Sequence, residues 1–171
     1  MEYVILVDAD DNEVGKMEKM QAHEEALLHR AFSVFLFNEK GEMLIHRRAK
    51  AKYHSGGLWT NACCSHPRPG ENTEAAAHRR MQEELGMDCS IEEKFSFLYK
   101  KELDHGLTEH ELDHVFVGRY EELPDFNEYE IDACKFITID DLKESIKTSP
   151  EMYTEWFRIV CQKYGEQIFP Y

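Results

Sequence analysis

Residues 58–86 constrain the fold more than any other stretch of the chain. They begin with a short apolar run, Leu-Trp-Thr-Asn-Ala-Cys-Cys, that reaches Pro67 after a serine and a histidine. Pro67 and Pro69 interrupt any regular element, because proline lacks a backbone donor and fixes φ. A helical pattern follows at residues 72–85, and Gly86 is a natural stop for it. An extended segment, a break and a helix are therefore expected in succession.

The other expected elements are mostly strands. Apolar or aromatic runs predict strands at residues 3–7, 14–17, 31–38, 43–47, 91–103, 112–120 and 131–137. Helices are expected at residues 138–146, with Thr138 as N-cap, and at 151–164 after Pro150. Strands precede, separate and follow the helices without strict alternation. This order indicates an α+β fold, a mixed sheet with helices packed on it.

Length and charge limit the classes of function. The chain has 171 residues, which suits one domain with a single core, and we expect residues 1–171 to form it. The net charge of -14 argues against nucleic acid or an anionic membrane as a partner. An anionic small molecule would need a local basic pocket or a bridging cation.

The sequence predicts a cytoplasmic protein. No apolar run is long enough to span a bilayer, and the first residues resemble no secretory signal. Five scattered cysteines do not form a disulfide framework, so free thiols are expected.

Histidines, carboxylates and cysteines supply the candidate chemistry. His23, His29 and His66 lie in three segments, and Glu109 and Glu111 in a fourth, where alternation would point both carboxylates to one side. Such a set suits zinc, manganese or iron, although solvated surface groups are an alternative. Cys63 and Cys64 precede His66 closely; one of them is a candidate catalytic thiol, and two small core residues are the alternative.

Charged and aromatic side chains offer a second set of alternatives. Arg79 and Arg80 lie four residues before Glu83 and Glu84, so the four form either exposed ion pairs or a site for phosphate and magnesium. The basic segment that contains Arg47, Arg48, Lys50 and Lys52, with Lys19 upstream, is either a solvated loop or the basic pocket. Trp156 is either a core residue or a ring that faces a cation.

The combination resembles the type 1 isopentenyl-diphosphate isomerases of the Nudix superfamily. The resemblance rests on His-Arg-Ala-Phe-Ser at 29–33, Arg-Arg-Ala at 47–49, Leu-Trp-Thr-Asn at 58–61, Cys-Ser-His-Pro at 64–67, Glu-Leu-Gly at 84–86, Glu-His-Glu at 109–111 and Trp156. It implies a Nudix-like mixed sheet with helices on both sides. It also implies the reversible conversion of isopentenyl diphosphate to dimethylallyl diphosphate in isoprenoid biosynthesis, catalysed by a monomer or weak dimer.

One departure from the hydrolase pattern bears on the activity. The Nudix box is G-x5-E-x7-R-E-U-x-E-E-x-G-U, with U aliphatic. Aligned on Gly86, this chain has Ser65 in place of the first glycine and Arg80 in place of the glutamate after the arginine. A cation therefore replaces a metal-binding carboxylate. The exchange favours binding a diphosphate over hydrolysing it, and a Nudix hydrolase of a nucleoside diphosphate derivative is the second hypothesis. A metal- or nucleotide-binding module without catalysis is the third.

The resemblance also implies individual roles. Cys64 and Glu111 would be the catalytic pair, with Tyr99 hydrogen-bonded near Glu111. One divalent metal, Mn²⁺ or Zn²⁺, would be bound by His23, His29, His66, Glu109 and Glu111. Glu84 would hold a Mg²⁺ that bridges to the diphosphate, which would contact Lys19, Arg48, Lys52 and Arg80. Trp156 would face the hydrocarbon, and Phe32, Phe35, Trp59 and Tyr99 would help to exclude water.

Overall fold

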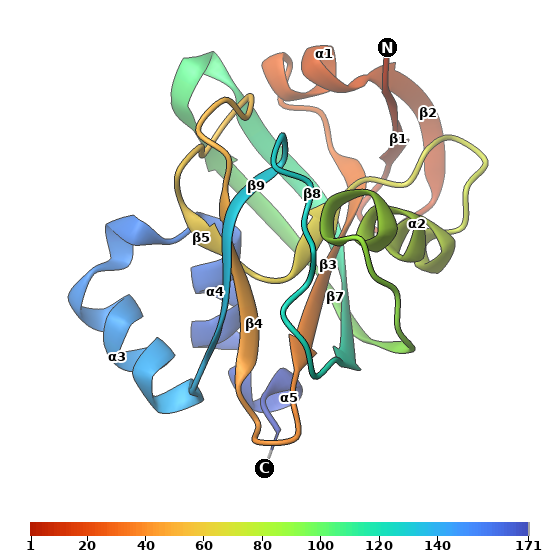
Figure 1. Cartoon of the computed structure of the whole chain (residues 1–171). Coiled ribbons are helices and arrows are strands. Elements are labelled where there is room, and N and C mark those ends of the chain that lie inside the picture. Colours follow the sequence, from red (N-terminus) through yellow and green to blue (C-terminus); the bar gives the residue numbers. More distant parts are fainter. Residues whose placement is uncertain (171) are drawn as a thin grey trace.

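The computed structural model describes residues 1–170, and within them a mixed sheet of nine strands forms the centre of the molecule (Figure 1). The strands are β1 (Tyr3–Val7), β2 (Glu13–Glu18), β3 (His29–Phe37), β4 (Met43–Arg48), β5 (Trp59–Thr60), β6 (Cys63–Ser65), β7 (Ile91–Glu102), β8 (Thr108–Arg119) and β9 (Ile131–Ile137). The α-helices are α1 (Lys19–Glu24), α2 (Thr73–Arg80), α3 (Ile139–Thr148), α4 (Glu155–Lys163) and α5 (Gly165–Ile168). None of the helices in residues 1–170 has the length and apolar character needed to cross a membrane.

Strand β3 organises the sheet. It pairs parallel with β8 along its whole length and antiparallel with β1, β4 and β6. Strand β8 continues into an antiparallel pair with β7, and β4 into antiparallel pairs with β5 and β9. From Ala31 to Phe37 the β3 sequence is apolar except for Ser33, because both of its faces are covered.

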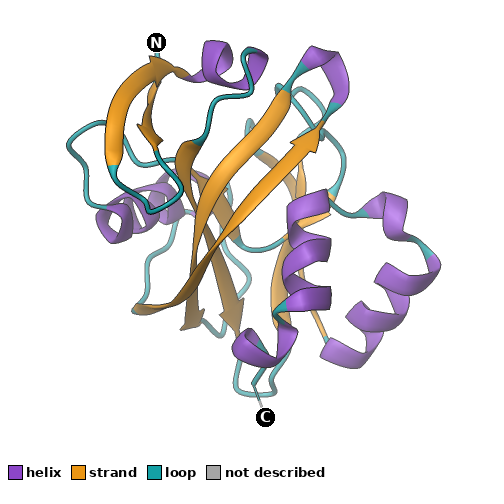
Figure 2. Ribbon diagram, turned by 180° about the vertical axis from the view of Figure 1, so that it is seen from behind, coloured by secondary structure: helices purple, strands orange, loops and turns teal. Residues whose placement is uncertain are grey.

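Alternate residues of β3 belong to two hydrophobic cores. Phe35 and Phe37 pack in one core with residues of α3 and α4, whereas Val34 and Leu36 pack in the other with residues of α2. Figures 1 and 2 show these helices on opposite faces of the sheet. Each fully buried side chain of this size contributes about 1.5–3 kcal/mol. The α+β fold with helices on both sides is therefore confirmed.

The helix expected at residues 72–85 is present in two parts. Helix α2 starts after Asn72, whose side chain accepts a hydrogen bond of 3.1 Å from the Ala75 amide. The chain then widens into a π-helical turn, η1 (Met81–Leu85), which ends at Gly86 with a φ of 63°. A Cβ on Gly86 would lie 2.5 Å from the carbonyl oxygen of Asp125, so both the conformation and the contact require glycine.

The prediction of a single helix at residues 151–164 is wrong. A 3₁₀ turn, η3 (Pro150–Met152), is followed by extended backbone at Tyr153 and Thr154, and only then does α4 begin. The Thr154 amide donates to the carbonyl of Trp59 at 3.0 Å, and its hydroxyl donates to that of Thr60 at 2.9 Å. These contacts with β5 hold the chain extended. The sequence pattern around residue 154 could not predict them, because β5 is distant in the chain.

Strand β8 starts four residues before the expected boundary at 112. Its first residues pair with the end of β7, from Glu102 opposite Thr108 to Tyr99 opposite Glu111. The long β7–β8 pair therefore places both glutamates of the Glu-His-Glu motif within the sheet.

Candidate active site

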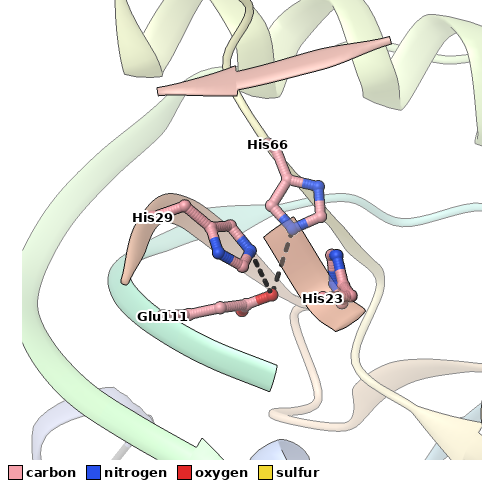
Figure 3. A group of neighbouring side chains, drawn as sticks. All are labelled: His23, His29, His66 and Glu111. Carbon is pink, nitrogen blue, oxygen red and sulfur yellow. Dashed lines mark hydrogen bonds and ion pairs between the residues drawn. The ribbon is translucent and has the colours of Figure 1, made fainter. Parts of the chain in front are cut away.

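Three histidines and one glutamate from separate elements converge where β3 begins (Figure 3). His23 comes from α1, His29 from the start of β3, and Glu111 from β8, where the parallel register places it opposite His29. His66 follows β6. One ligand atom from each residue lies within 4.8 Å of the others. The four residues define the cation cluster.

Backbone carbonyls fix the tautomers of two of these histidines. Nδ1 of His23 lies 2.7 Å from the Lys19 carbonyl, and Nδ1 of His29 lies 2.8 Å from that of Leu27. A carbonyl only accepts, so Nδ1 carries the proton and Nε2 keeps its lone pair. Nε2 of His23 is buried without a hydrogen-bond partner among residues 1–170, and Nε2 of His29 is buried with Oε1 of Glu111 at 3.4 Å. Unpaired lone pairs that face one point are the arrangement expected for a metal site.

The ionisation states suit a divalent cation. Burial lowers the pKa of His23 and, against the attraction of Glu111, lowers that of His66 to about 4. Both rings are therefore neutral at pH 7, the form that binds metal. Burial raises the pKa of Glu111, but the adjacent rings of His29 and His66 outweigh this effect and hold the pKa of the carboxyl well below its usual value. His66 Nε2 lies 3.0 Å from Glu111 Oε1.

Glu109 lies next to this cluster with a histidine that the sequence analysis did not single out. Its Oε1 is 3.0 Å from Nε2 of His54, and these two residues form a second group with His23. The other carboxylate oxygen, Oε2, is buried and has no hydrogen-bond partner in the described chain. Burial and the neighbouring charge of Glu111 raise the pKa of Glu109. The two carboxylates thus differ in their environments although they belong to the same strand.

A cavity opens beside the cluster. Of the residues predicted from the sequence, it is lined by Lys19, Arg48, Lys52, Cys64, His66, Arg80, Glu84, Glu109, Glu111 and Trp156. His23 and His29 lie deeper, with fully buried side chains. Phe32 also lines the cavity, whereas Phe35, Trp59 and Tyr99 belong to the core that packs against α3 and α4. These three rings therefore do not line the cavity, and their expected part in excluding water stays a prediction.

The two adjacent cysteines face opposite sides of β6. Cys63 is fully buried in the core that contains α2, and its thiol donates to Glu84 at 3.5 Å. Cys64 lines the cavity and pairs in register with Ser33 of β3. Burial raises the pKa of the Cys64 thiol, partly offset by Arg48, so the thiol is protonated at neutral pH. Of the two, Cys64 is the thiol that a substrate in the cavity can meet.

Tyr99 lies directly opposite Glu111 in the β7–β8 pair. Its hydroxyl is buried without a hydrogen-bond partner in the described part of the chain, and burial raises its pKa. The phenol is therefore a neutral donor close to the cation cluster.

The basic residues of the cavity are mostly paired with carboxylates. Lys19 contacts Glu2 at 2.5 Å, Lys52 pairs with Glu130, and Arg80 pairs with Glu84. The Arg79–Glu83 and Arg80–Glu84 pairs at a spacing of four residues, expected as one alternative, are also present. Arg48 instead donates to the His54 carbonyl at 3.1 Å and stacks over the ring of Trp156 at 5.4 Å.

The sequence analysis gave no role in the site to six polar residues of the cavity: Glu2, Ser33, Tyr53, His54, Ser65 and Glu130. His54 and Tyr53 occur in the basic segment that was noted for Lys52, but only its positive charges were taken as signals. Glu130 lies in an acidic loop, where nothing in the sequence separates it from its neighbours.

The chain resembles known proteins in its sequence and in its fold. The NUDIX domain model matches residues 27–157. Among solved structures, DR0079 from Deinococcus radiodurans superposes with a TM-score of 0.78, at 22% identity, over 95% of this chain and 99% of its own. The MutT protein of Methanosarcina mazei gives a TM-score of 0.67 at 18% identity, over 81% and 94%. The chain is thus a NUDIX protein.

Relatives with higher sequence identity to this chain define its family within the NUDIX proteins more closely. The isopentenyl-diphosphate Delta-isomerase of Pectobacterium atrosepticum is 46% identical over 91% of this chain and 87% of its own length. Isopentenyl-diphosphate Delta-isomerase 2 of Photorhabdus laumondii is 47% identical over 92% and 89%. The chain belongs to the isopentenyl-diphosphate Delta-isomerases.

Proposed function

We propose that this chain interconverts isopentenyl diphosphate and dimethylallyl diphosphate. Support comes from the named relatives, which match almost the whole chain, and from the cavity, which holds a thiol and a carboxylate side by side with cationic side chains. The single observation that carries the proposal is that Cys64 and Glu111, from different strands, line the same cavity. An acid and a base on two sides of one substrate are what a proton shift along an allyl unit requires.

The cation cluster fits a tightly bound divalent metal. We assign His23, His29, His66 and Glu111 as ligands, with the unpartnered Oε2 of Glu109 as the fifth. A set of three imidazoles and two carboxylates suits Zn²⁺ or Mn²⁺. When bound, the metal fixes Glu111 in position and withdraws charge from it.

The diphosphate is assigned to the basic side of the cavity. Arg48, Lys52 and Arg80 line this side of the cavity, together with Lys19, the first residue of α1. Glu84, 5% exposed and paired with Arg80, would turn to a Mg²⁺ that accompanies the diphosphate. The magnesium offsets the repulsion that a chain of net charge -14 exerts on an anion.

The proton transfers are assigned to Cys64 and Glu111. Protonation of the double bond produces a tertiary carbocation, and removal of a proton from the other side gives the isomer. The buried Cys64 thiol holds its proton at neutral pH, and Glu111 is ionised beside the Tyr99 ring. These states give one donor and one acceptor at the start of a cycle.

Trp156 is assigned to the hydrocarbon end. Its side chain is 4% exposed and lines the cavity, and Arg48 lies over its ring at 5.4 Å. The carbocation would face the same ring beside this guanidinium, with water largely excluded. Exclusion of water matters because water would trap the carbocation as an alcohol.

Hydrolysis of a nucleoside diphosphate derivative is the second candidate. It is disfavoured because Arg80 replaces a carboxylate of the Nudix box and neutralises Glu84.

We further propose that residues 1–171 act as one domain, as a monomer or weak dimer in the cytoplasm, where free thiols such as Cys64 stay reduced.

The test is proton NMR of the purified protein with isopentenyl diphosphate, Mg²⁺ and Zn²⁺ in D₂O. We expect dimethylallyl diphosphate to accumulate with deuterium in its carbon skeleton. Release of phosphate from nucleoside diphosphate derivatives, with isopentenyl diphosphate unchanged, would support the hydrolase instead.

A further inference from the structure

His54 belongs to the chain segment between β4 and β5, which we call the 49–58 segment. The segment carries Lys52 and directly follows Arg48, and both of these positive charges line the cavity. Most residues around His54 are partly accessible, but His54 itself is only 2% exposed. A buried histidine in a surface segment indicates a specific partner inside the molecule.

Three parts of the site meet at His54. Its Nε2 lies 3.0 Å from Oε1 of Glu109, its ring meets Trp156 edge-on at 5.8 Å, and its carbonyl accepts the hydrogen bond from Arg48. Glu109 borders the cation cluster, Trp156 the hydrocarbon end, and Arg48 the diphosphate end. One residue therefore contacts each region of the proposed site.

The middle of the 49–58 segment, residues 50–56, has little backbone support, whereas its ends are held by backbone hydrogen bonds from Ala49 to Glu130 and from Gly57 to Arg48. Within residues 1–170, the one backbone–backbone hydrogen bond that involves residues 50–56 joins the Lys52 amide to the Ala49 carbonyl at 3.1 Å. The segment folds back sharply, since a Cβ on Gly56 would lie 2.5 Å from the carbonyl oxygen of Lys50. Its conformation thus depends on side-chain anchors, of which His54 is the buried one.

From these contacts we propose that His54 is a positioning residue, which couples cation binding at Glu109 to the order of the 49–58 segment. A cation that binds Glu109 fixes the position of its carboxylate. The same carboxylate contacts the His54 ring, so the ring is fixed with it. The ring in turn holds the carbonyl that orients Arg48. Because coupling between two sites is reciprocal, a diphosphate held by the segment strengthens cation binding to the same degree. The inference rests on the cation site proposed above.

The test compares hydrogen exchange of the 49–58 amides with and without Zn²⁺, and the affinity for inorganic diphosphate under the same conditions. In the unmodified chain, Zn²⁺ should slow exchange at residues 53–56 and tighten diphosphate binding, each by roughly tenfold. In His54→Ala, Zn²⁺ should still bind and both responses should vanish. His54→Leu keeps the volume without the ring nitrogens and serves the same purpose if the alanine variant does not fold.

His110→Ala is the matched control. His110 lies between the two glutamates, but its Nδ1 bonds the carbonyl of Ala26 at 3.0 Å and it belongs to neither metal group. This variant should respond to Zn²⁺ as the unmodified chain does.

Two results would overturn the proposal without touching the assigned reaction. One is a Zn²⁺ response that persists in His54→Ala. The other is loss of one imidazole from the zinc shell of His54→Ala in X-ray absorption, which would make His54 a ligand. Failure of the unmodified chain to bind Zn²⁺ would instead remove the cation site of the proposed function, and this proposal with it.

Discussion

At the scale of single residues, the site depends on which way neighbouring side chains point. Cys63 and Cys64 have the same chemistry and adjacent positions, yet one thiol is in the core and the other in the cavity. Strand geometry produces the difference, since successive side chains project to opposite faces. The pair therefore provides a test with an internal control.

Cys64→Ala should lower kcat about a thousandfold, because it removes one of the two proton-transfer groups. Cys63→Ala should cost no more than about 1–2 kcal/mol of stability and leave kcat within a few fold. Turnover by the NMR assay and thermal unfolding measure the two effects. If Cys64→Ala retains a tenth of the activity, the thiol does not transfer the proton.

His46 should make the fold sensitive to acid. It is 3% exposed in β4, its Nδ1 donates to the Ala62 carbonyl at 2.9 Å, and burial lowers its pKa to about 3. An unfolded chain protonates this ring near pH 6.5. Between pH 6.5 and 3 the unfolded state thus binds more protons, so stability falls as pH decreases, by up to about 1.4 kcal/mol per pH unit.

Urea unfolding between pH 7 and pH 4 checks this contribution. The His46→Asn variant should be less stable at pH 7 but lose stability more slowly on acidification. Parallel curves for the two proteins would show that His46 is protonated in the folded state.

At the scale of elements, the turn that ends η1 packs against the loop before β9. Gly86 ends the helical run and receives the Asp125 carbonyl at close range, and the neighbouring Asn127 amide donates to the Glu84 carbonyl at 2.8 Å. The same turn therefore positions Glu84, the proposed magnesium ligand. A change at this turn affects both stability and the site.

Gly86→Ala should lower the melting temperature by roughly 4–8 °C, since a positive φ and a backbone clash together cost about 2 kcal/mol. Gly70→Ala is the control, because Gly70 has a φ of +80° but nothing within 4 Å of the added Cβ. It should show only the smaller conformational cost of about 1 kcal/mol. Equal losses in the two variants would mean that the Asp125 contact is not tight.

At the scale of the whole molecule, the cation cluster joins elements that are distant in the chain. Helix α1, the start of β3, the segment after β6 and strand β8 each contribute one side chain (Figure 3). A cation bound there ties these elements together only in the folded state, so it stabilises the fold by linkage.

Removal of the cation should therefore lower the melting temperature. At a free Zn²⁺ concentration a hundred times Kd, the stabilisation is about 2.7 kcal/mol, which corresponds to roughly 5–10 °C for a chain of this size. Calorimetry with and without a chelator measures it. His29→Ala should show no difference between the two conditions, and a chelator effect that persists in this variant would place the cation elsewhere.

The sequence by itself determined the elements whose causes are local. Asn72 and Gly86 mark the ends of one helical run and Thr138 the start of another, because caps act within a few residues. The length and aromatic content of the run at residues 31–38 predicted a buried strand, which is β3 in the structure. The motif residues from His29 to Trp156 also indicated the family, which the comparisons confirm.

Only the tertiary structure decided what depends on contacts between distant residues. The break at Tyr153 and Thr154 comes from hydrogen bonds to β5. The resemblance had already favoured Cys64 over Cys63, but what covers each face of β6 is seen only in the structure. His54 has no motif around it and gains its place from Glu109 and Trp156, more than fifty and a hundred residues away. Local sequence patterns carry no information about such partners, because distant residues come into contact only in the folded protein.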